Sequence, residues 1–145
     1  MKHVVVAVIP DMHHVVGHGG AEAGAQARQA LLQAVGTPER GLLIDGIWAT
    51  FSDADVALDG AFALASTGAA VALAAGDMVA EAGSPPTGAA PLLAANAARA
   101  ARSGELLVPS RWLDGRELPL GVGRFPAPEG LIDHAPQMAM LKDYR

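Results

Sequence analysis

The sequence has no cysteine among its 145 residues, and this absence excludes whole classes of protein. Without thiols there can be no disulfide framework, no zinc ribbon and no thiol nucleophile. Aromatic residues are scarce as well, at 4% of the chain, whereas 51% is hydrophobic and much of that is alanine. Side chains this small predict thin, closely packed helices with few large anchors in the core.

Basic residues are few and scattered, so the sequence offers no positive patch for a polyanion. The formal net charge is −5, and no block of Lys or Arg occurs. This composition argues against nucleic acid and against an anionic membrane surface as partners. The uncharged apolar stretch at residues 61–76 is too short for a bilayer, which takes about 20 residues. Because Met1-Lys2-His3 leads directly into a strand-like run, we expect no secretory leader and a cytoplasmic location.

The order of the predicted elements indicates an α+β fold. The length is typical of one domain, so we expect residues 1–145 to form a single one. Strands are predicted at 3–9, within 42–51 around Asp45-Gly46 as a hairpin, at 69–76 with 77–80 pairing back, at 105–108, at 118–123 and at 138–141. Helices are predicted at 21–35 after a flexible Gly-rich loop at 17–20, at 54–65 with Ser52-Asp53 as N-cap, and from about 88 to 103. This is the order of a ferredoxin-like βαββαβ core with a C-terminal extension.

Two aspartates stand at the ends of apolar strands, and they are the leading candidates for chemistry. Asp11 follows the first strand, and Asp45 lies in the hairpin. If the first strand lies beside the hairpin, the two carboxylates converge, and such a pair could bind Mg²⁺ or Mn²⁺ with a nucleotide phosphate. The structural alternative is that Asp45 is a turn residue and Asp11 a helix cap.

These motifs resemble those of the catalytic domain of class III nucleotidyl cyclases, the adenylyl and guanylyl cyclases. Ile9-Pro10-Asp11 stands where the family has its first metal aspartate, and Ile44-Asp45-Gly46 stands where it has the second. The helix from Gly88 through Asn96 and the strand from Gly104 through Ser110 resemble later family motifs. The resemblance implies a cyclase-homology fold, metal binding by Asp11 and Asp45, a purine nucleotide ligand and a dimer that shares its site.

The same alignment of motifs predicts that the catalytic groups are lost. Leu92 takes the place of the family's transition-state asparagine, and Asn96 takes the place of its arginine. A neutral amide cannot supply the fixed donor fork that meets charge on a phosphate. Arg99 lies three residues further on, about 4.5 Å along the helix axis and turned away, so we do not expect it to substitute. No catalytic residue is therefore assigned.

Other positions carry weaker signals. Gly41 replaces the purine-reading lysine, with Arg40 one place off, and Pro85 replaces the base-reading aspartate, so no base preference follows. His13, His14 and His18 lie close together, and the i, i+4 pair has the spacing of helical metal ligands. The glycines around them favour a solvated loop instead.

Three hypotheses remain open. The leading one is a degenerate, catalytically inactive cyclase-like domain that acts in signalling as a regulatory module, binding a second copy or a heteromeric protein partner, with residual metal or nucleotide affinity. The second is an active minimal adenylyl or guanylyl cyclase completed by a partner subunit. The third is a plain ferredoxin-like scaffold whose aspartates are turn and cap residues only.

Overall fold

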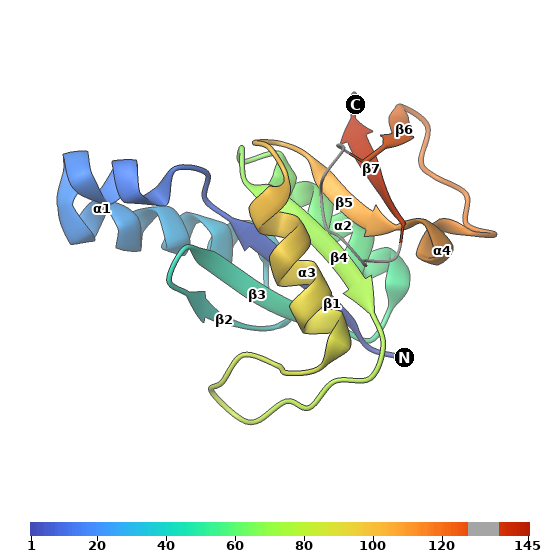
Figure 1. The fold of residues 1–145 in the computed structure, drawn as a ribbon, viewed down its shortest axis with the longest axis horizontal. Coiled ribbons are helices and arrows are strands. Elements are labelled where there is room, and N and C mark those ends of the chain that lie inside the picture. Colours follow the sequence, from blue (N-terminus) through green and yellow to red (C-terminus); the bar gives the residue numbers. More distant parts are fainter. Residues whose placement is uncertain (128–136) are drawn as a thin grey trace.

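The computed structural model describes residues 1–127 and 137–145, which form one seven-stranded sheet with helices on both faces (Figure 1). The strands lie in the order β2-β3-β1-β4-β5-β7-β6. All neighbours are antiparallel except β4 and β5, which are parallel. The elements are β1 (His3–Val8), α1 (Met12–Val35), β2 (Glu39–Leu43), β3 (Gly46–Phe51), α2 (Ala54–Ala65), β4 (Ala70–Ala75), α3 (Ala89–Ala100), β5 (Leu106–Pro109), α4 (Ser110–Leu113), β6 (Val122–Pro126) and β7 (Met138–Asp143).

The first six elements confirm the predicted ferredoxin-like core. The sequence β1-α1-β2-β3-α2-β4 gives a four-stranded antiparallel sheet in the order β2-β3-β1-β4, and β5, β6 and β7 extend it beyond β4. The strand predicted at 138–141 is present as β7, whereas the strand predicted at 118–123 begins only at Val122. Among residues 1–127 and 137–145, no helix is long and apolar enough to cross a membrane.

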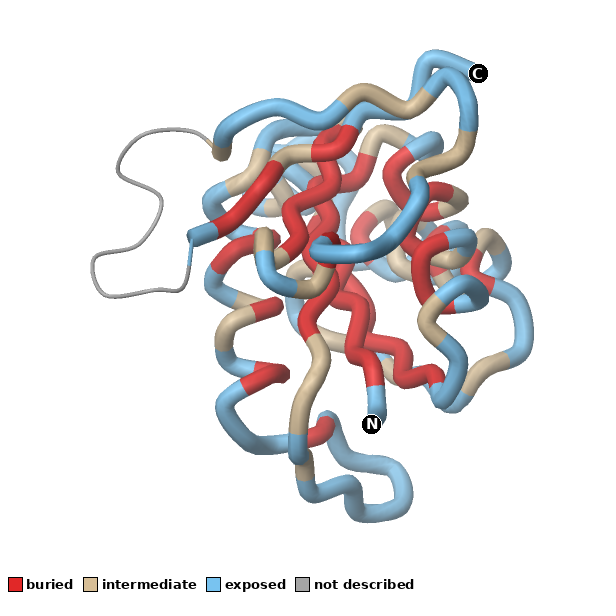
Figure 2. Tube along the Cα trace, turned by 90° about the vertical axis from the view of Figure 1, so that its right-hand side faces the viewer, coloured by how far each residue is buried: buried red, intermediate tan, exposed pale blue. Residues whose placement is uncertain are grey.

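The central strand β1 divides the core into two layers because its side chains alternate between the faces of the sheet. Val5 and Ala7 belong to the layer beneath α1 and α2, whereas Val4, Val6 and Val8 belong to the layer beneath α3. All six residues of β1 are buried, and Figure 2 shows long buried stretches, in red, through the middle of the molecule. Packing on both faces therefore holds the end of β1 in place, and with it the start of the segment that follows Val8.

The hairpin between β2 and β3 is present, but its turn is one residue earlier than Asp45-Gly46 suggests. Leu43 pairs with Gly46, so the turn residues are Ile44 and Asp45. Gly46 already belongs to β3 and pairs with Val8 of β1. A glycine is needed here because a Cβ would overlap the carbonyl oxygen of Ala7, not because the turn requires a positive φ.

The Gly-rich segment at 17–20 was predicted as a flexible loop, and this is wrong. Helix α1 begins at Met12 and runs to Val35 with one interruption at Gly20, whose φ of 76° and ψ of −178° are not helical. The chain doubles back there, so that two helical segments lie side by side (Figure 1). They pack at Gly24, where an added Cβ would lie 3.0 Å from Val16 and 3.1 Å from Met12. Gly20 allows the chain to reverse, and Gly24 allows the two helical segments to pack closely.

The start of α2 agrees with the sequence prediction, whereas the segment 77–80 does not. Helix α2 begins as predicted, with the Asp53 carboxylate accepting hydrogen bonds from the amides of Asp55 and Val56 at 2.8 and 3.0 Å. The segment 77–80 does not pair back on β4. Val79 instead pairs with Thr87 across the loop that leads to α3, and each amide donates a hydrogen bond to the other residue's carbonyl at 2.9 Å.

Candidate functional site

The two candidate aspartates line one pocket at the carboxyl end of β1. Its volume is about 330 Å³. Its walls are residues 8–13, the hairpin residue Asp45, Ala70 at the start of β4, and Ala98, Arg99 and Ala101 at the end of α3. The predicted convergence of Asp11 and Asp45 follows from the pairing of β1 with β3, which brings the hairpin turn beside the strand end.

Asp11 is held in an unusual backbone conformation and leaves its carboxylate free of a capping role. Its φ of 55° and ψ of 40° are left-handed, and it has the sole positive φ among the non-glycine residues of 1–127 and 137–145. The residue stands at the N-cap of α1, where its carbonyl accepts hydrogen bonds from His14 and Val15. The side chain makes no capping hydrogen bond. Asp11 therefore stands at the cap position that the structural alternative predicts, but its side chain does not do the capping.

Asp45 is fixed by hydrogen bonds on both sides of the turn. Its carbonyl accepts from the Ile9 amide at 2.8 Å, which joins the turn to the residue after β1. The preceding carbonyl, that of Ile44, accepts from Arg28 Nη1 of α1 at 2.9 Å. With the main chain secured in this way, the Asp45 carboxylate is directed toward the end of α3.

Arg99 binds that carboxylate through both of its oxygens. Nε donates to Oδ2 at 2.9 Å and Nη2 donates to Oδ1 at 3.2 Å, which is a bidentate pair. These hydrogen bonds lower the pKa of Asp45 against the opposing effect of burial, and the same pair raises the pKa of Arg99. The side chains are 47% and 26% exposed for Arg99 and Asp45, so solvent reaches the pair and its net contribution to stability is about 1 kcal/mol or less.

The pairing of Arg99 with Asp45 was not predicted, since the sequence placed Leu92 and Asn96 at the family's catalytic positions and set Arg99 aside. Leu92 is 63% exposed and Asn96 is exposed, and neither lines the pocket. Arg99 enters the pocket because the last turn of α3, not its middle, lies over the ends of β1 and the hairpin. Arg99 lies one turn beyond Asn96, which made it a poor substitute for the family's arginine. That same position near the end of α3 brings it to Asp45. The periodicity of α3 alone could not show which turn faces the hairpin.

The remaining candidates are not assembled into a site. Arg40, Gly41 and Pro85 do not line the pocket. His13 lines it, whereas His14 and His18 contact each other along α1, with ring centroids 4.1 Å apart and ring planes inclined at 57°. Over residues 1–127 and 137–145, no group of three or more His, Cys, Asp or Glu side chains is placed to hold a metal ion.

The donor set therefore does not fit a divalent cation as the side chains stand. Mg²⁺ and Mn²⁺ prefer several oxygen ligands, and two carboxylates are available here. Both oxygens of Asp45 already accept hydrogen bonds from Arg99. The other carboxylate, that of Asp11, makes no capping hydrogen bond to α1.

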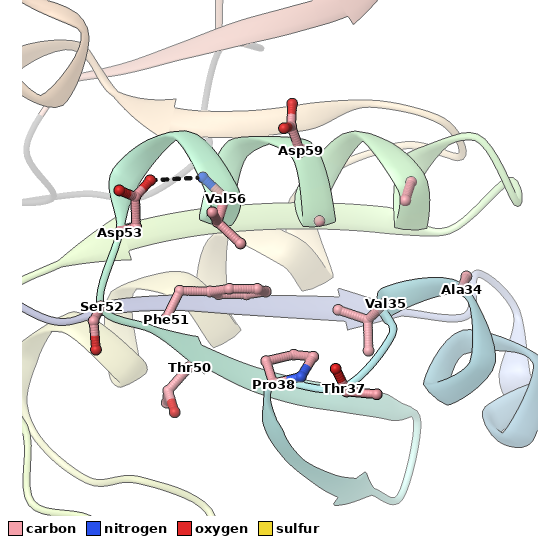
Figure 3. A pocket seen from close by; sticks show the side chains of 12 residues that line it. Ala34, Val35, Thr37, Pro38, Thr50, Phe51, Ser52, Asp53, Val56 and Asp59 are labelled. Atoms are coloured by element: carbon pink, nitrogen blue, oxygen red, sulfur yellow. Dashed lines mark hydrogen bonds between the residues drawn. The ribbon is translucent and has the colours of Figure 1, made fainter.

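A larger cleft lies elsewhere, against α2. It has a volume of about 630 Å³ and lies between α2, the end of α1 and β3. Figure 3 shows Val35, Phe51 and Val56 pointing into this space, while Asp59 points away from it. Asp53, at its edge, is already used as the cap of α2. Size alone does not make a chemical site, and the smaller pocket holds the convergent charged groups.

No model of a known protein family matches the sequence, and a search of curated proteins finds no match. Solved structures do match. The catalytic core of a rhodopsin-guanylyl cyclase with converted specificity, solved with ATPαS, is 9% identical with a TM-score of 0.68 over 99% of this chain and 95% of that one. An adenylate/guanylate cyclase/hydrolase from Silicibacter pomeroyi is 15% identical, with a TM-score of 0.64 over 99% and 96%. An adenylyl cyclase from P. aeruginosa is 13% identical, with a TM-score of 0.64 over 99% and 94%. The chain has the fold of nucleotidyl cyclase catalytic domains, as the motifs predicted.

Proposed function

We propose that this chain is a catalytically inactive domain of the nucleotidyl cyclase fold that acts as a regulatory module through contact with a second copy or another protein. Residual affinity for Mg²⁺ or Mn²⁺ and a purine nucleotide would centre on Asp11 and Asp45, and it stays low while Arg99 binds Asp45. One observation carries the proposal: the pocket shared by these aspartates contains a single arginine, and that arginine is bound to Asp45.

An arginine engaged in this way is not free to stabilise a transition state. Cyclisation of a nucleoside triphosphate builds negative charge on phosphate oxygens as pyrophosphate leaves, and a preorganised donor must meet that charge. The donors Nε and Nη2 of Arg99 already point at a carboxylate of the same chain. Loss of one such donor typically lowers the rate about a hundred- to a thousandfold. The exposed Leu92 and Asn96 supply no replacement within the pocket.

The second candidate is an active cyclase whose missing groups come from a partner subunit. What favours it is that two structural neighbours were solved as cyclase catalytic domains with ATPαS and with GTP. Leu92 and Asn96, being exposed on α3, do not prevent a partner from supplying donors from outside.

The test is an assay for cyclic nucleotide with the purified chain, Mn²⁺ and ATP or GTP, beside Asp11→Ala. We expect no product from either protein. Product that disappears in Asp11→Ala would contradict the proposal, and product that forms only after a second chain is added would favour the partner-completed enzyme. Thermal melting with Mn²⁺ and nucleotide adds a binding readout, since a ligand of the native state must raise the melting temperature. A plain scaffold would show neither a shift nor an effect of Asp45→Asn on it.

A further inference from the structure

The pocket already contains a cation, and it is a side chain. The Arg99 guanidinium meets Asp45 with two donors on two oxygens, the arrangement in which a planar fork matches a carboxylate. A divalent ion bound to Asp45 would need the same oxygens. The guanidinium and the metal therefore compete for one carboxylate.

Both partners of this ion pair are held in place by other parts of the fold. Asp45 is fixed through the hydrogen bond from the Ile9 amide to its carbonyl. Arg99 projects from the last turn of α3, whose buried alanines Ala94, Ala97 and Ala98 pack on the face of the sheet. Because both partners belong to one folded chain, their pairing costs no translational freedom, whereas a metal ion must be captured from solution.

Among the charged residues that line the pocket, Arg99 is the one that opposes binding of a divalent metal ion. The charged side chains lining the pocket are Asp11, Asp45 and Arg99, and His13 also lines it. With Arg99 in place, one of the two carboxylates is neutralised. Without it, two carboxylates from adjacent strand ends would face one pocket with no counter-charge from its lining. Two unpaired carboxylates are a donor set that a hard divalent cation can use.

We propose that Arg99 acts as the resident cation of this pocket and keeps divalent metal ions away from Asp45. The inference rests on the proposed function, because an enzyme that used a metal here would need Asp45 free. The inference goes beyond the proposed function because it assigns the exclusion of metal ions to Arg99. Removal of that residue should create a metal site in a protein that otherwise has little affinity for metal.

The experiment is calorimetric titration of the full chain with MnCl₂ and no nucleotide. We expect Arg99→Ala to bind Mn²⁺ up to about fivefold more tightly than the unaltered chain, because the metal ion no longer has to displace an exposed ion pair of this strength. The double variant Arg99→Ala, Asp45→Asn should lose the gain. Arg102→Ala is the matched control, because Arg102 is exposed, near the same helix end and not part of the pocket lining, and it should bind as the unaltered chain does.

Arg99→Lys keeps the proposal testable if the alanine variant fails to fold. An ammonium is a point charge without the fork, so this variant should bind Mn²⁺ with intermediate affinity. Affinity that is the same in the unaltered chain, Arg99→Lys and Arg99→Ala would overturn the inference, as would a gain that persists in the double variant. Cyclic nucleotide formation by the unaltered chain would instead overturn the proposed function, so the two failures are distinguishable.

Discussion

The carbonyl oxygen of Ala7 lies where any side chain at position 46 would have to stand, so that β1 and β3 approach each other through the bare backbone of Gly46. Gly46 pairs with Val8 at the end of β1 and directly follows Asp45. The close approach therefore sets the position of the hairpin turn relative to the strand end. Asp45 reaches the pocket because its neighbour has no side chain.

Gly46→Ala should destabilise the protein and also disturb the pocket. A Cβ at this place meets backbone on a buried strand, so the strands must separate, and we expect a loss of about 2 kcal/mol or more in the free energy of unfolding. Urea unfolding followed by circular dichroism measures it. Gly17→Ala, where an added Cβ meets nothing within 4 Å, should leave stability unchanged or raise it. Equal stability of the Gly46 and Gly17 variants would contradict the close packing.

Asp53 should contribute to stability as the cap of α2. Its carboxylate accepts from the amides of Asp55 and Val56, two of the donors that a helix start leaves without partners. Asp53→Ala should lower the free energy of unfolding by about 1 kcal/mol, and Asp53→Asn should retain most of it. Asp59→Ala, an exposed change within the same helix, is the control and should have little effect. Matching losses at positions 53 and 59 would indicate a charge effect instead of a cap.

The contrast between Asp45 and Arg99 shows how far the sequence could lead. Strand ends and a hairpin are local features, indicated by β-branched runs and by Asp45-Gly46, so the sequence could predict that Asp11 and Asp45 line the same pocket. Arg99 depends on how α3 lies across the sheet, and that is set by the packing of Ala94, Ala97 and Ala98 against β1 and β4. Alanine repeats present similar surfaces at several helix rotations. The sequence therefore could not predict which turn of α3 faces the hairpin.

The glycines at the start of α1 illustrate the same limit and lead to a paired prediction. Gly20 has a φ of 76° at the reversal between the two helical segments, whereas Gly17 lies within the first segment with open space around it. Gly20→Ala should destabilise the chain by about 1 kcal/mol, because a side chain strains a left-handed backbone. Gly17→Ala should stabilise it by up to about 1 kcal/mol through helix propensity. Thermal melting distinguishes them, and stabilisation by both changes would mean that 12–35 forms one uninterrupted helix.

The last prediction concerns His3, which is 5% exposed at the start of the central strand. Its Nδ1 accepts a hydrogen bond from Trp112 Nε1 at 3.1 Å, so the ring must be neutral at that nitrogen. Burial lowers the pKa of His3, and the positive charges of Arg116 and the amino terminus add to the effect, while Asp53 opposes it. Arg116 stacks on the Trp112 ring at 4.2 Å, which places a cation close to the pair.

A histidine that is neutral in the fold makes stability depend on pH in one direction. The unfolded chain takes up a proton at His3 near its ordinary pKa of 6.5, before the folded chain does. The contribution of His3 to the free energy of unfolding is thus complete above about pH 6.5 and declines as the pH falls below that value. It levels off once the pH has passed the lower pKa of His3 in the folded state. Urea unfolding between pH 5 and pH 8 should show this decline. It should be absent in His3→Gln, whose amide still offers an acceptor to Trp112, and retained in His13→Gln, an exposed histidine. An unchanged pH dependence in His3→Gln would show that the decline comes from other groups.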